Sequence, residues 1–411
     1  MTRPVRETAA LSESERAFVD ELDRVAVGLA ADRTAARGAG RAPQEGRVDR
    51  DLVAALGRAG LLRKLFGGGA GNSRAGVPSG AAALQLCLLR ESLARVDTGA
   101  ETALALQGLG SYPILQSGTP EQVARWLPGV ISGELVAAFA LSEPDAGSDA
   151  AALALEARPD GAGWTLHGIK TWISNAPDAD VYSVFARTGP GAGSKGVTAF
   201  VVDGGAAGLT GQPLEMLSPH AIGRLDFDGV RVGPTDVLGE VGQGFVVAMR
   251  TLDLFRPSVG AFAVGMAQFA LEAAVEWVTS RAIYGGLLGD QQAVQHVLAE
   301  MATRIDAGRL LVHRAARAYD AGLPPREVSA MAAMAKLFAT ETAQWVVDQS
   351  VQLHGARALQ RGHPLEHLYR DVRAPRIYEG ASEVQRTIIA RHLIAQHGAR
   401  RGRGAEPVTT P

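Results

Sequence analysis

The sequence predicts an α+β protein in which a helical domain, a β-rich domain and a second helical domain follow one another. Apolar residues recur at helical spacing through the first third of the chain. From Leu135, glycine, proline and aspartate separate short runs of alternating or β-branched residues, and long helical patterns return after Gly244. We therefore expect an N-terminal all-α domain over 1–134, a middle antiparallel β domain over 135–240, a C-terminal helical bundle of the four-helix type over 241–398 and a disordered polar tail over 399–411.

Several predicted helices begin at a residue that can cap them. Asp49 precedes one apolar pattern, and Thr119 precedes another that has Pro120 at its first helical position. Pro257 is expected to kink or restart the helix that contains it, because proline has no backbone N–H. Helices are expected over Leu11–Arg37, Leu52–Leu56, Ala81–Arg95, Thr102–Gly108, Glu121–Leu127, Phe245–Tyr284, Asp290–Asp320, Arg326–Gly355 and Ser382–Gln396.

The middle of the chain carries the strand signals. The predicted strands are Trp164–Ile173, Val181–Arg187, Val197–Val202 and Arg224–Val232. A glycine-rich stretch in the first third, Gly67–Gly80, is expected to be a loop.

The composition excludes several classes of protein. Hydrophobic residues make up 46% and charged residues 20% of the 411 residues, which is typical of a globular chain and not of a disordered one. A formal net charge of −2 gives no indication of a nucleic-acid or anionic-membrane partner. The single cysteine, Cys87, excludes an internal disulfide and is expected to be a small buried side chain. The first residues lack the apolar core of a signal peptide, and no uncharged apolar run reaches about 18 residues, so we expect no membrane span and a cytoplasmic protein.

Three short segments have compositions that packing alone does not require. AFALSEPDAGSD (Ala138–Asp149) passes from an apolar run into serines, proline and glycine, which suit a hydrogen-bonding or anionic ligand such as a flavin or a phosphate. Taken alone, this segment also fits an ordinary turn after a strand. GIKTWISNA (Gly168–Ala176) places Trp172 and Ser174 two residues apart, where they could cover and hydrogen-bond an aromatic ring; a core tryptophan is the alternative.

The third segment, IYEGASEVQ (Ile377–Gln385), sets Glu379 between an aromatic residue and a glycine, ahead of a helix. A partly buried carboxylate there would have the raised pKa that a general base needs near neutral pH. A glutamate on a surface loop is the alternative.

A metal site is not expected. His363 to His367 fits the H-x-x-E-H pattern of one zinc-peptidase class. That pattern requires both histidines on one helical turn, and Pro364 makes His363 an unsuitable helical ligand. No third ligand accompanies them in the sequence.

Taken together, the segments resemble the acyl-CoA dehydrogenase family, in order and spacing, over nearly the whole chain. The first two segments are similar to the family's flavin segments. The matching stretches that follow are LGEVGQGFVVAMRTLDLFRPSVGA (Leu238–Ala261), Arg281-x-x-Tyr284-Gly285 with Gln292 eight residues after the tyrosine, Gln352-Leu353-His354-Gly355, Tyr369-Arg370-Asp371, and Arg376–Gly380.

The resemblance implies FAD as the cofactor and the α,β-dehydrogenation of an acyl-CoA thioester as the reaction. Glu379 is implied to take the α-proton while the β-hydride passes to the flavin. Residues implied to contact FAD within one chain are Phe139, Leu141, Ser142, Ser148, Trp172 and Ser174; those implied to reach the FAD of a neighbouring chain are Arg281, Tyr284, Gln292, Gln352 and Gly355; those implied to contact substrate are Ser148, Asp253, Arg256, Tyr378 and Gly380.

The position of the base can be checked against the alternative that some family members use. In those proteins the base is a glutamate on the helix near Asp253, directly before an arginine. Here Phe255 precedes Arg256, so the helix base is absent and Glu379 is the consistent choice.

Some positions depart from the family's pattern and leave the substrate open. Leu217–Gly233 lacks the usual glycine–arginine–serine pattern, and Ala381 stands where a threonine usually follows the Glu-Gly pair. Leu61–Pro78 also lacks its usual pattern. His220, within the first of these stretches, could touch a ligand, but a surface histidine at a strand end is the simpler expectation.

The resemblance further implies a homodimer or homotetramer, with an electron-transfer flavoprotein as electron acceptor. Three alternatives share the fold: a dehydrogenase that acts on an acyl-carrier-protein thioester in secondary metabolism, a flavin monooxygenase or lyase, and a non-catalytic flavoprotein scaffold. The retained Glu379 argues against the last two.

Overall fold

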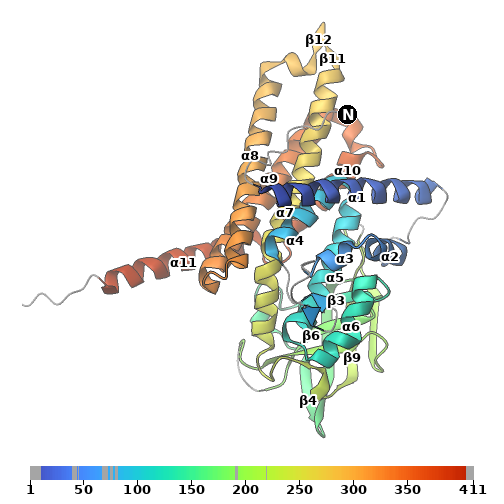
Figure 1. Ribbon diagram of the computed structural model, residues 1–411, viewed down its shortest axis with the longest axis vertical. Coiled ribbons are helices and arrows are strands. Elements are labelled where there is room, and N and C mark those ends of the chain that lie inside the picture. Colours follow the sequence, from blue (N-terminus) through green and yellow to red (C-terminus); the bar gives the residue numbers. More distant parts are fainter. Residues whose placement is uncertain are drawn as a thin grey trace, which may run out of the picture.

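The computed structural model describes residues 11–38, 44, 46–66, 73–74, 77–78, 82–189, 193–218 and 220–403. Along the chain, a group of helices is followed by a β-sheet and then by long helices, as expected (Figure 1). Most of the loop expected over 67–80 lies outside the described residues; the parts described are the two-residue strands β1 (Ser73–Arg74) and β2 (Val77–Pro78).

The N-terminal helices begin where the capping residues predict. The Asp49 side chain accepts a hydrogen bond from the Leu52 N–H at 3.0 Å. Thr119 and Gln122 form a reciprocal capping box ahead of Pro120. Cys87 is buried, as expected, and burial raises the pKa of its thiol. The helices are α1 (Glu13–Gly38), α2 (Arg50–Arg58), α3 (Leu61–Lys64), α4 (Ala83–Val96), α5 (Thr98–Ser117) and α6 (Pro120–Ser132).

The middle domain is one sheet whose strand order is β10-β7-β6-β4-β5-β9-β8, with β3 beside β6. It is not purely antiparallel as expected, because β3 and β4 both run parallel to β6. These parallel pairs join strands that are not consecutive, which short hairpin signals in a sequence cannot indicate. The strands are β3 (Ala137–Ala140), β4 (Glu156–Asp160), β5 (Gly163–Ser174), β6 (Val181–Arg187), β7 (Val197–Asp203), β8 (Leu209–Pro213), β9 (Ile222–Val232) and β10 (Val237–Leu238).

The C-terminal domain is built on α7 (Gly244–Ser280), which continues through Pro257 instead of restarting there. Small residues let its neighbours approach closely: a Cβ at Gly265 would lie 2.5 Å from the Glu91 carbonyl oxygen of α4. The other elements are β11 (Ala282–Ile283), β12 (Gly286–Leu287), α8 (Gln292–Asp320), α9 (Pro325–His354), α10 (Pro364–Asp371) and α11 (Ser382–Arg403).

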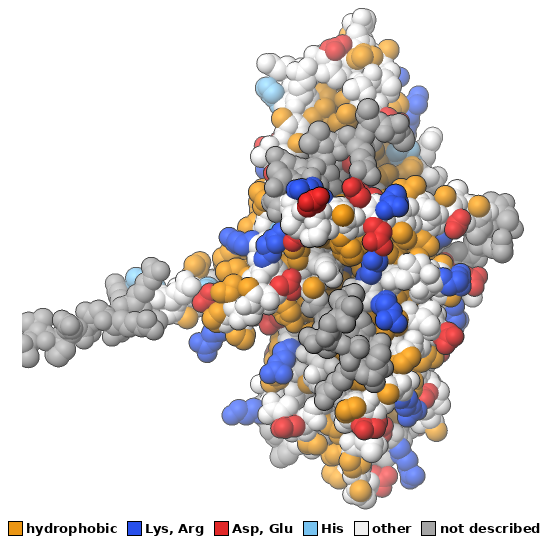
Figure 2. All heavy atoms as spheres, in the orientation of Figure 1, with side chains coloured by type: hydrophobic (Ala, Val, Ile, Leu, Met, Phe, Trp, Pro, Cys, Tyr) orange, Lys and Arg blue, Asp and Glu red, His pale blue; other side chains and the backbone are white. Residues whose placement is uncertain are grey.

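α11 projects from the body of the molecule and ends near the chain terminus (Figure 1). It continues to Arg403, so residues 399–403 of the segment expected to be a disordered tail are helical. The rest of that segment lies outside the described residues. Over the face drawn in Figure 2, side chains of both charges are interspersed with hydrophobic ones.

Among the described helices, α7 alone is long and apolar enough to span a membrane by length and composition. Of its most apolar window, 72% is buried inside the fold. The packing of this window against neighbouring helices is typical of a core helix.

Candidate active site

The loop between α10 and α11 carries Glu379 in a backbone conformation that few residues adopt. Glu379 has φ +52° and Gly380 has φ +95°. Glycine tolerates such a value, whereas a glutamate there is strained and needs its surroundings to hold it. Strained residues of this kind occur most often at functional sites.

Three side chains hold the backbone of this turn. Arg256 of α7 donates from Nε to the Glu379 carbonyl oxygen at 3.3 Å. Lys336 of α9 donates from Nζ to the Gly380 carbonyl oxygen at 2.7 Å, and Gln385 of α11 donates to the same oxygen at 2.8 Å. Three helices therefore fix the main chain on which the Glu379 side chain is mounted.

The Glu379 carboxylate is enclosed but not satisfied. The residue as a whole is half-buried, whereas its Oε2 atom is buried and has no hydrogen-bond partner among the described residues. A buried, unpaired carboxylate oxygen costs free energy unless a ligand or a proton meets it. The arrangement therefore leaves one oxygen available to accept a proton.

The electrostatics around this carboxylate favour a base that works near neutral pH. Burial raises the pKa of Glu379, while the charges of Arg90, Lys336 and Arg256 act to lower it. Burial also raises the pKa of the neighbouring Tyr378 hydroxyl. A carboxyl whose pKa is moved toward neutrality can take and release a proton with little driving-force penalty.

A buried ion pair on the N-terminal helices lies close enough to influence Glu379. Arg90 of α4 pairs with Glu101 of α5, and Arg90 Nη1 donates to Ser258 Oγ of α7 at 2.7 Å. Burial raises the pKa of Glu101 to about 7, against the effect of Arg90, and the Glu379 charge raises it further. Sequence reasoning did not identify Arg90, Glu101 or Lys336, because only the packing of distant helices brings them to the loop. Gln385 closes the predicted segment Ile377–Gln385, but its hydrogen bonds to the turn were not predicted.

The two predicted flavin segments lie side by side. Lys170 of β5 is fully buried and donates from Nζ to the Leu141 carbonyl oxygen at 2.9 Å and to Glu143 Oε1 at 2.7 Å. The Thr171 N–H donates to the Ser142 carbonyl oxygen at 3.0 Å. These bonds join the segment that follows β3 to the middle of β5, so Leu141 and Ser142 are brought close to the strand that carries Trp172.

Trp172 is not a core residue. It has φ +54° at an irregularity in the pairing of β5 with β9, and 49% of its surface is exposed. An irregularity of this kind redirects a side chain out of the regular alternation of a strand. Trp172 is therefore available to cover a ligand ring, and Ser174, two residues along the strand, is half-buried.

The remaining residues of the first segment differ in their surroundings. Phe139 is half-buried and packs against Phe185, with ring centroids 4.9 Å apart. Ser148 is exposed.

On α7, Asp253 and Arg256 form an ion pair at 3.1 Å, and burial raises the pKa of Asp253 despite that pair.

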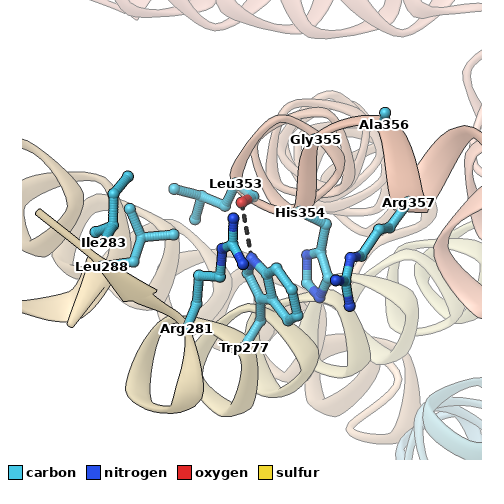
Figure 3. Close-up of a pocket in the computed structure, with 9 residues that line it drawn as sticks. All are labelled: Trp277, Arg281, Ile283, Leu288, Leu353, His354, Gly355, Ala356 and Arg357. Atoms are coloured by element: carbon cyan, nitrogen blue, oxygen red, sulfur yellow. Dashed lines mark hydrogen bonds between the residues drawn. The ribbon is translucent and has the colours of Figure 1, made fainter.

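A pocket lies where the ends of α7 and α9 meet. Its pocket, of about 370 Å³, is lined by Trp277, Arg281, Ile283, Leu288, Leu353, His354, Gly355, Ala356 and Arg357. The Trp277 ring stacks on His354 and donates from Nε1 to the Leu353 carbonyl oxygen at 3.0 Å (Figure 3). Arg281 and Arg357 both lie within cation–π distance of Trp277, at 5.7 and 5.0 Å. Two guanidinium groups beside stacked rings suit a ligand that carries both phosphate and an aromatic base.

Of the residues predicted to reach a neighbouring chain's cofactor, Arg281 and Gly355 line this pocket. Tyr284 has φ +51° in the turn between β11 and β12 and is 92% exposed. Gln292 begins α8 and Gln352 lies in the last turn of α9; both are exposed. Trp277, His354 and Arg357 were missed, although the last two belong to or follow the Gln352–Gly355 segment.

The histidines that resemble a zinc site have other roles. His363 caps α10 by accepting a hydrogen bond from the Leu365 N–H at 3.2 Å, and His367 contacts the Asp371 carboxylate at 3.1 Å. No cluster of three potential metal ligands occurs among the residues that the structure describes. His220 is not the surface histidine expected at a strand end: it is half-buried, and burial lowers its pKa.

Comparison with known proteins extends over the whole fold. The N-terminal, middle and C-terminal domain models of the acyl-CoA dehydrogenase family match residues 12–134, 138–230 and 242–394. The chain is similar to the probable acyl-CoA dehydrogenase FadE25 of Mycobacterium tuberculosis, with 34% identity over 382 residues, which are 91% of this chain and 95% of that protein.

Solved structures show the same similarity over most of the chain. A chain in the structure of the electron transferring flavoprotein of Acidaminococcus fermentans has a TM-score of 0.84 and 33% identity, over 93% of this chain and 98% of that one. The FAD complex of PigA has a TM-score of 0.84 and 26% identity, over 94% of this chain and 99% of that one. With all three domains matched in order, this chain belongs to the acyl-CoA dehydrogenase family of FAD-dependent oxidoreductases.

Proposed function

We propose that the protein catalyses the α,β-dehydrogenation of an acyl-CoA thioester and that Glu379 is the base that removes the α-proton. The observation that carries this assignment is the enclosed Glu379 Oε2, which has no partner among the described residues while the main chain around it is held by Arg256 and Lys336. A fixed backbone with a free carboxylate positions the base without occupying it.

The residues of this chain suit FAD. Trp172 is exposed at a strand irregularity, and the Leu141–Ser142 segment is fastened beside the same strand by Lys170 and Thr171. We propose that Phe139, Leu141, Ser142, Trp172 and Ser174 contact the flavin, with Ser148 near its phosphate or the substrate. When bound, FAD supplies the acceptor for the β-hydride.

Proton transfer, substrate binding and the exclusion of water depend on residues of the protein. Glu379 accepts the α-proton at its free oxygen. Asp253, Arg256, Tyr378 and Gly380 would surround the thioester end of the substrate. The buried helices around the loop exclude water, which strengthens the effect of Arg256 and Arg90 on developing negative charge.

We further propose that a second copy of the chain completes the cofactor site. The pocket beside Trp277 has the guanidinium groups of Arg281 and Arg357 for a pyrophosphate, and Tyr284, Gln292 and Gln352 are exposed around the same end of the helices. The projecting α11 also exposes Leu393 and Ile394. A homodimer or homotetramer would cover both surfaces. The similarity to a chain in an electron transferring flavoprotein structure supports such a flavoprotein as the acceptor.

The test is anaerobic reduction of the bound flavin by a panel of acyl-CoA thioesters. We expect loss of the visible flavin absorbance with at least one of them, and a rate about 10²–10⁴-fold lower in Glu379→Gln with FAD still bound. Glu300→Gln, an exposed glutamate on α8, is the control and should reduce at the wild-type rate. Undiminished reduction in Glu379→Gln would contradict the assignment of the base. If acyl-carrier-protein thioesters reduce the flavin and acyl-CoA does not, the acyl group is carried by a protein and not by CoA. The proposed dehydrogenation would be unaffected by that result.

A further inference from the structure

A buried lysine on α9, Lys336, makes no direct ion pair with a carboxylate among the described residues. Lys336 lies on α9 with 0% of its surface exposed, among small buried side chains of the same helix that include Ala332, Ala339 and Thr340. Its Nζ donates to the Gly380 carbonyl oxygen at 2.7 Å. No carboxylate lies within ion-pair distance of Nζ among the residues the structure describes. Burying a charge in this way is expensive, so the position calls for a physical reason.

Lys170 provides the comparison. It is also fully buried, but its Nζ meets the Glu143 carboxylate directly at 2.7 Å, as is usual for a structural ion pair. Burial lowers the pKa of both lysines to about 8. Both lysines are therefore desolvated, but Lys336 makes no direct carboxylate contact among the described residues, and its ammonium is directed instead at the turn that carries Glu379.

We propose that Lys336 is a positioning residue for the base: its ammonium fastens the left-handed turn at Glu379–Gly380 and supplies a positive charge that favours the ionised form of the Glu379 carboxylate. This inference rests on the proposed role of Glu379. It assigns to α9 a part in the reaction that the sequence does not indicate, because Lys336 lies 44 residues before Gly380.

Lys336 provides both a hydrogen bond to the turn and a positive charge near the Glu379 carboxylate. Its backbone is strained at Glu379, so the Gly380 carbonyl must be held if the side chain is to keep one direction. An amide could meet that requirement alone, and Gln385 already donates to the same oxygen at 2.8 Å. What Lys336 adds to Gln385 is charge close to a carboxylate.

Other charges act on the same pair. Glu379 faces Arg90 from α4, Arg256 from α7 and Lys336 from α9, and it influences Glu101 on α5 and the adjacent Tyr378. The groups that act on Lys336 are Glu379, Arg256, Glu341 and Glu383. Lys336 lowers the pKa of Glu379, so its removal must raise that pKa. The acid limb of the pH profile, on which protonation of Glu379 slows flavin reduction, should then move to higher pH.

Two variants separate the hydrogen bond from the charge. Lys336→Met removes both with little change of volume, and Lys336→Gln keeps a donor without the charge. The readout is the pH dependence of anaerobic flavin reduction at saturating substrate. We expect the acid limb to move to higher pH in both variants. The plateau rate should fall by roughly 10–100-fold in Lys336→Met, the scale expected when a reacting group is displaced by about 1 Å, and less in Lys336→Gln.

Thr340→Val is the matched control, because Thr340 is buried one turn further along α9 and bonds only to the carbonyl oxygens of Lys336 and Leu337 among the described residues. It should leave the acid limb in place. An unchanged limb in both lysine variants, or an equal shift in Thr340→Val, would overturn the proposal. If Lys336→Met does not fold, Lys336→Gln decides the question alone.

A second measurement separates this inference from the proposed function. The carboxyl stretching band of Glu379, identified by its loss in Glu379→Gln, can be titrated by infrared difference spectroscopy without substrate. A higher midpoint in Lys336→Gln than in wild type supports the role of Lys336, and an equal midpoint contradicts it. If no thioester reduces the wild-type flavin, the proposed dehydrogenation is wrong, whatever the infrared titration gives for Lys336.

Discussion

The Ser218 hydroxyl donates to Asp371 Oδ1 at 2.5 Å, which fastens the middle domain to the helix that precedes the loop carrying Glu379. The other carboxylate oxygen of Asp371 accepts a hydrogen bond from Thr98 of the N-terminal domain at 2.7 Å and contacts His367 at 3.1 Å. All three domains therefore meet at one carboxylate. Burial acts to raise the pKa of Asp371, but the bonds from His367, Ser218 and Thr98 outweigh it and the pKa is lowered.

We expect Asp371→Asn to destabilise the protein by about 2–3 kcal/mol, because several hydrogen bonds to a buried charged acceptor are weakened together. Thermal unfolding followed by circular dichroism and flavin fluorescence measures the loss. Asp226→Asn is the control, since its ion pair with Arg224 is exposed on β9 and exposed pairs contribute little. Equal melting temperatures for the two variants would show that the carboxylate does not join the domains.

His367 should make stability depend on pH through the same carboxylate. Its hydrogen bond to Asp371 raises the pKa of His367 above the unfolded value. Protonated His367 therefore contributes stability that is fully present below about pH 6.5 and is lost as the pH rises through the folded-state pKa. Denaturant unfolding across this window should show a steeper fall for wild type than for His367→Gln. The exposed His296 provides a control, and His296→Gln should keep the wild-type slope.

Replacing Glu101 should shift the pH dependence of flavin reduction in the direction opposite to that expected for replacing Lys336. In wild type, Glu101 offsets the charge of Arg90 wherever the pH leaves its carboxyl ionised. Glu101→Gln leaves that charge unbalanced beside Glu379, so the pKa of Glu379 should fall and the acid limb of flavin reduction should move to lower pH. The same stopped-flow profile used for Lys336 measures it. A shift to higher pH would mean that Glu101 acts on the loop by packing and not by charge.

A side chain at Gly380 is expected to displace the turn that carries Glu379. A Cβ there would lie 2.5 Å from Gln385 Nε2, and φ is +95°. Gly322 has φ +66°, but a Cβ at that position would have no neighbour within 4 Å, so Gly322→Ala carries the backbone strain alone. We expect both alanine variants to lose roughly 1–2 kcal/mol from the left-handed conformation. Gly380→Ala should lose more and should also abolish rapid flavin reduction. Equal stability and activity in the two variants would show that the turn tolerates displacement.

Local structure could be predicted from the sequence wherever neighbouring residues determine it. The caps at Asp49 and Thr119 depend on backbone groups within three residues, and both were confirmed. Val181–Arg187 was predicted with the bounds of β6, because its run of valines and aromatic residues is bordered by turn residues. The continuation of α7 through Pro257 was not predicted, since packing on several sides supports a helix that the local sequence would break.

By itself the sequence determined the order of the three domains and the family's segments, and it favoured Glu379 over the helix position at Phe255 as the base. The tertiary structure alone decided the parallel pairing of β3 and β4 with β6, the exposure of Trp172, the burial of Glu379 Oε2 and the contacts of Lys336 and Asp371. Ser218 and Asp371 are 153 residues apart, and Lys336 and Gly380 are 44 apart. Helix periodicity and capping act over a few residues, whereas burial and long-range hydrogen bonds exist only once distant elements have packed together.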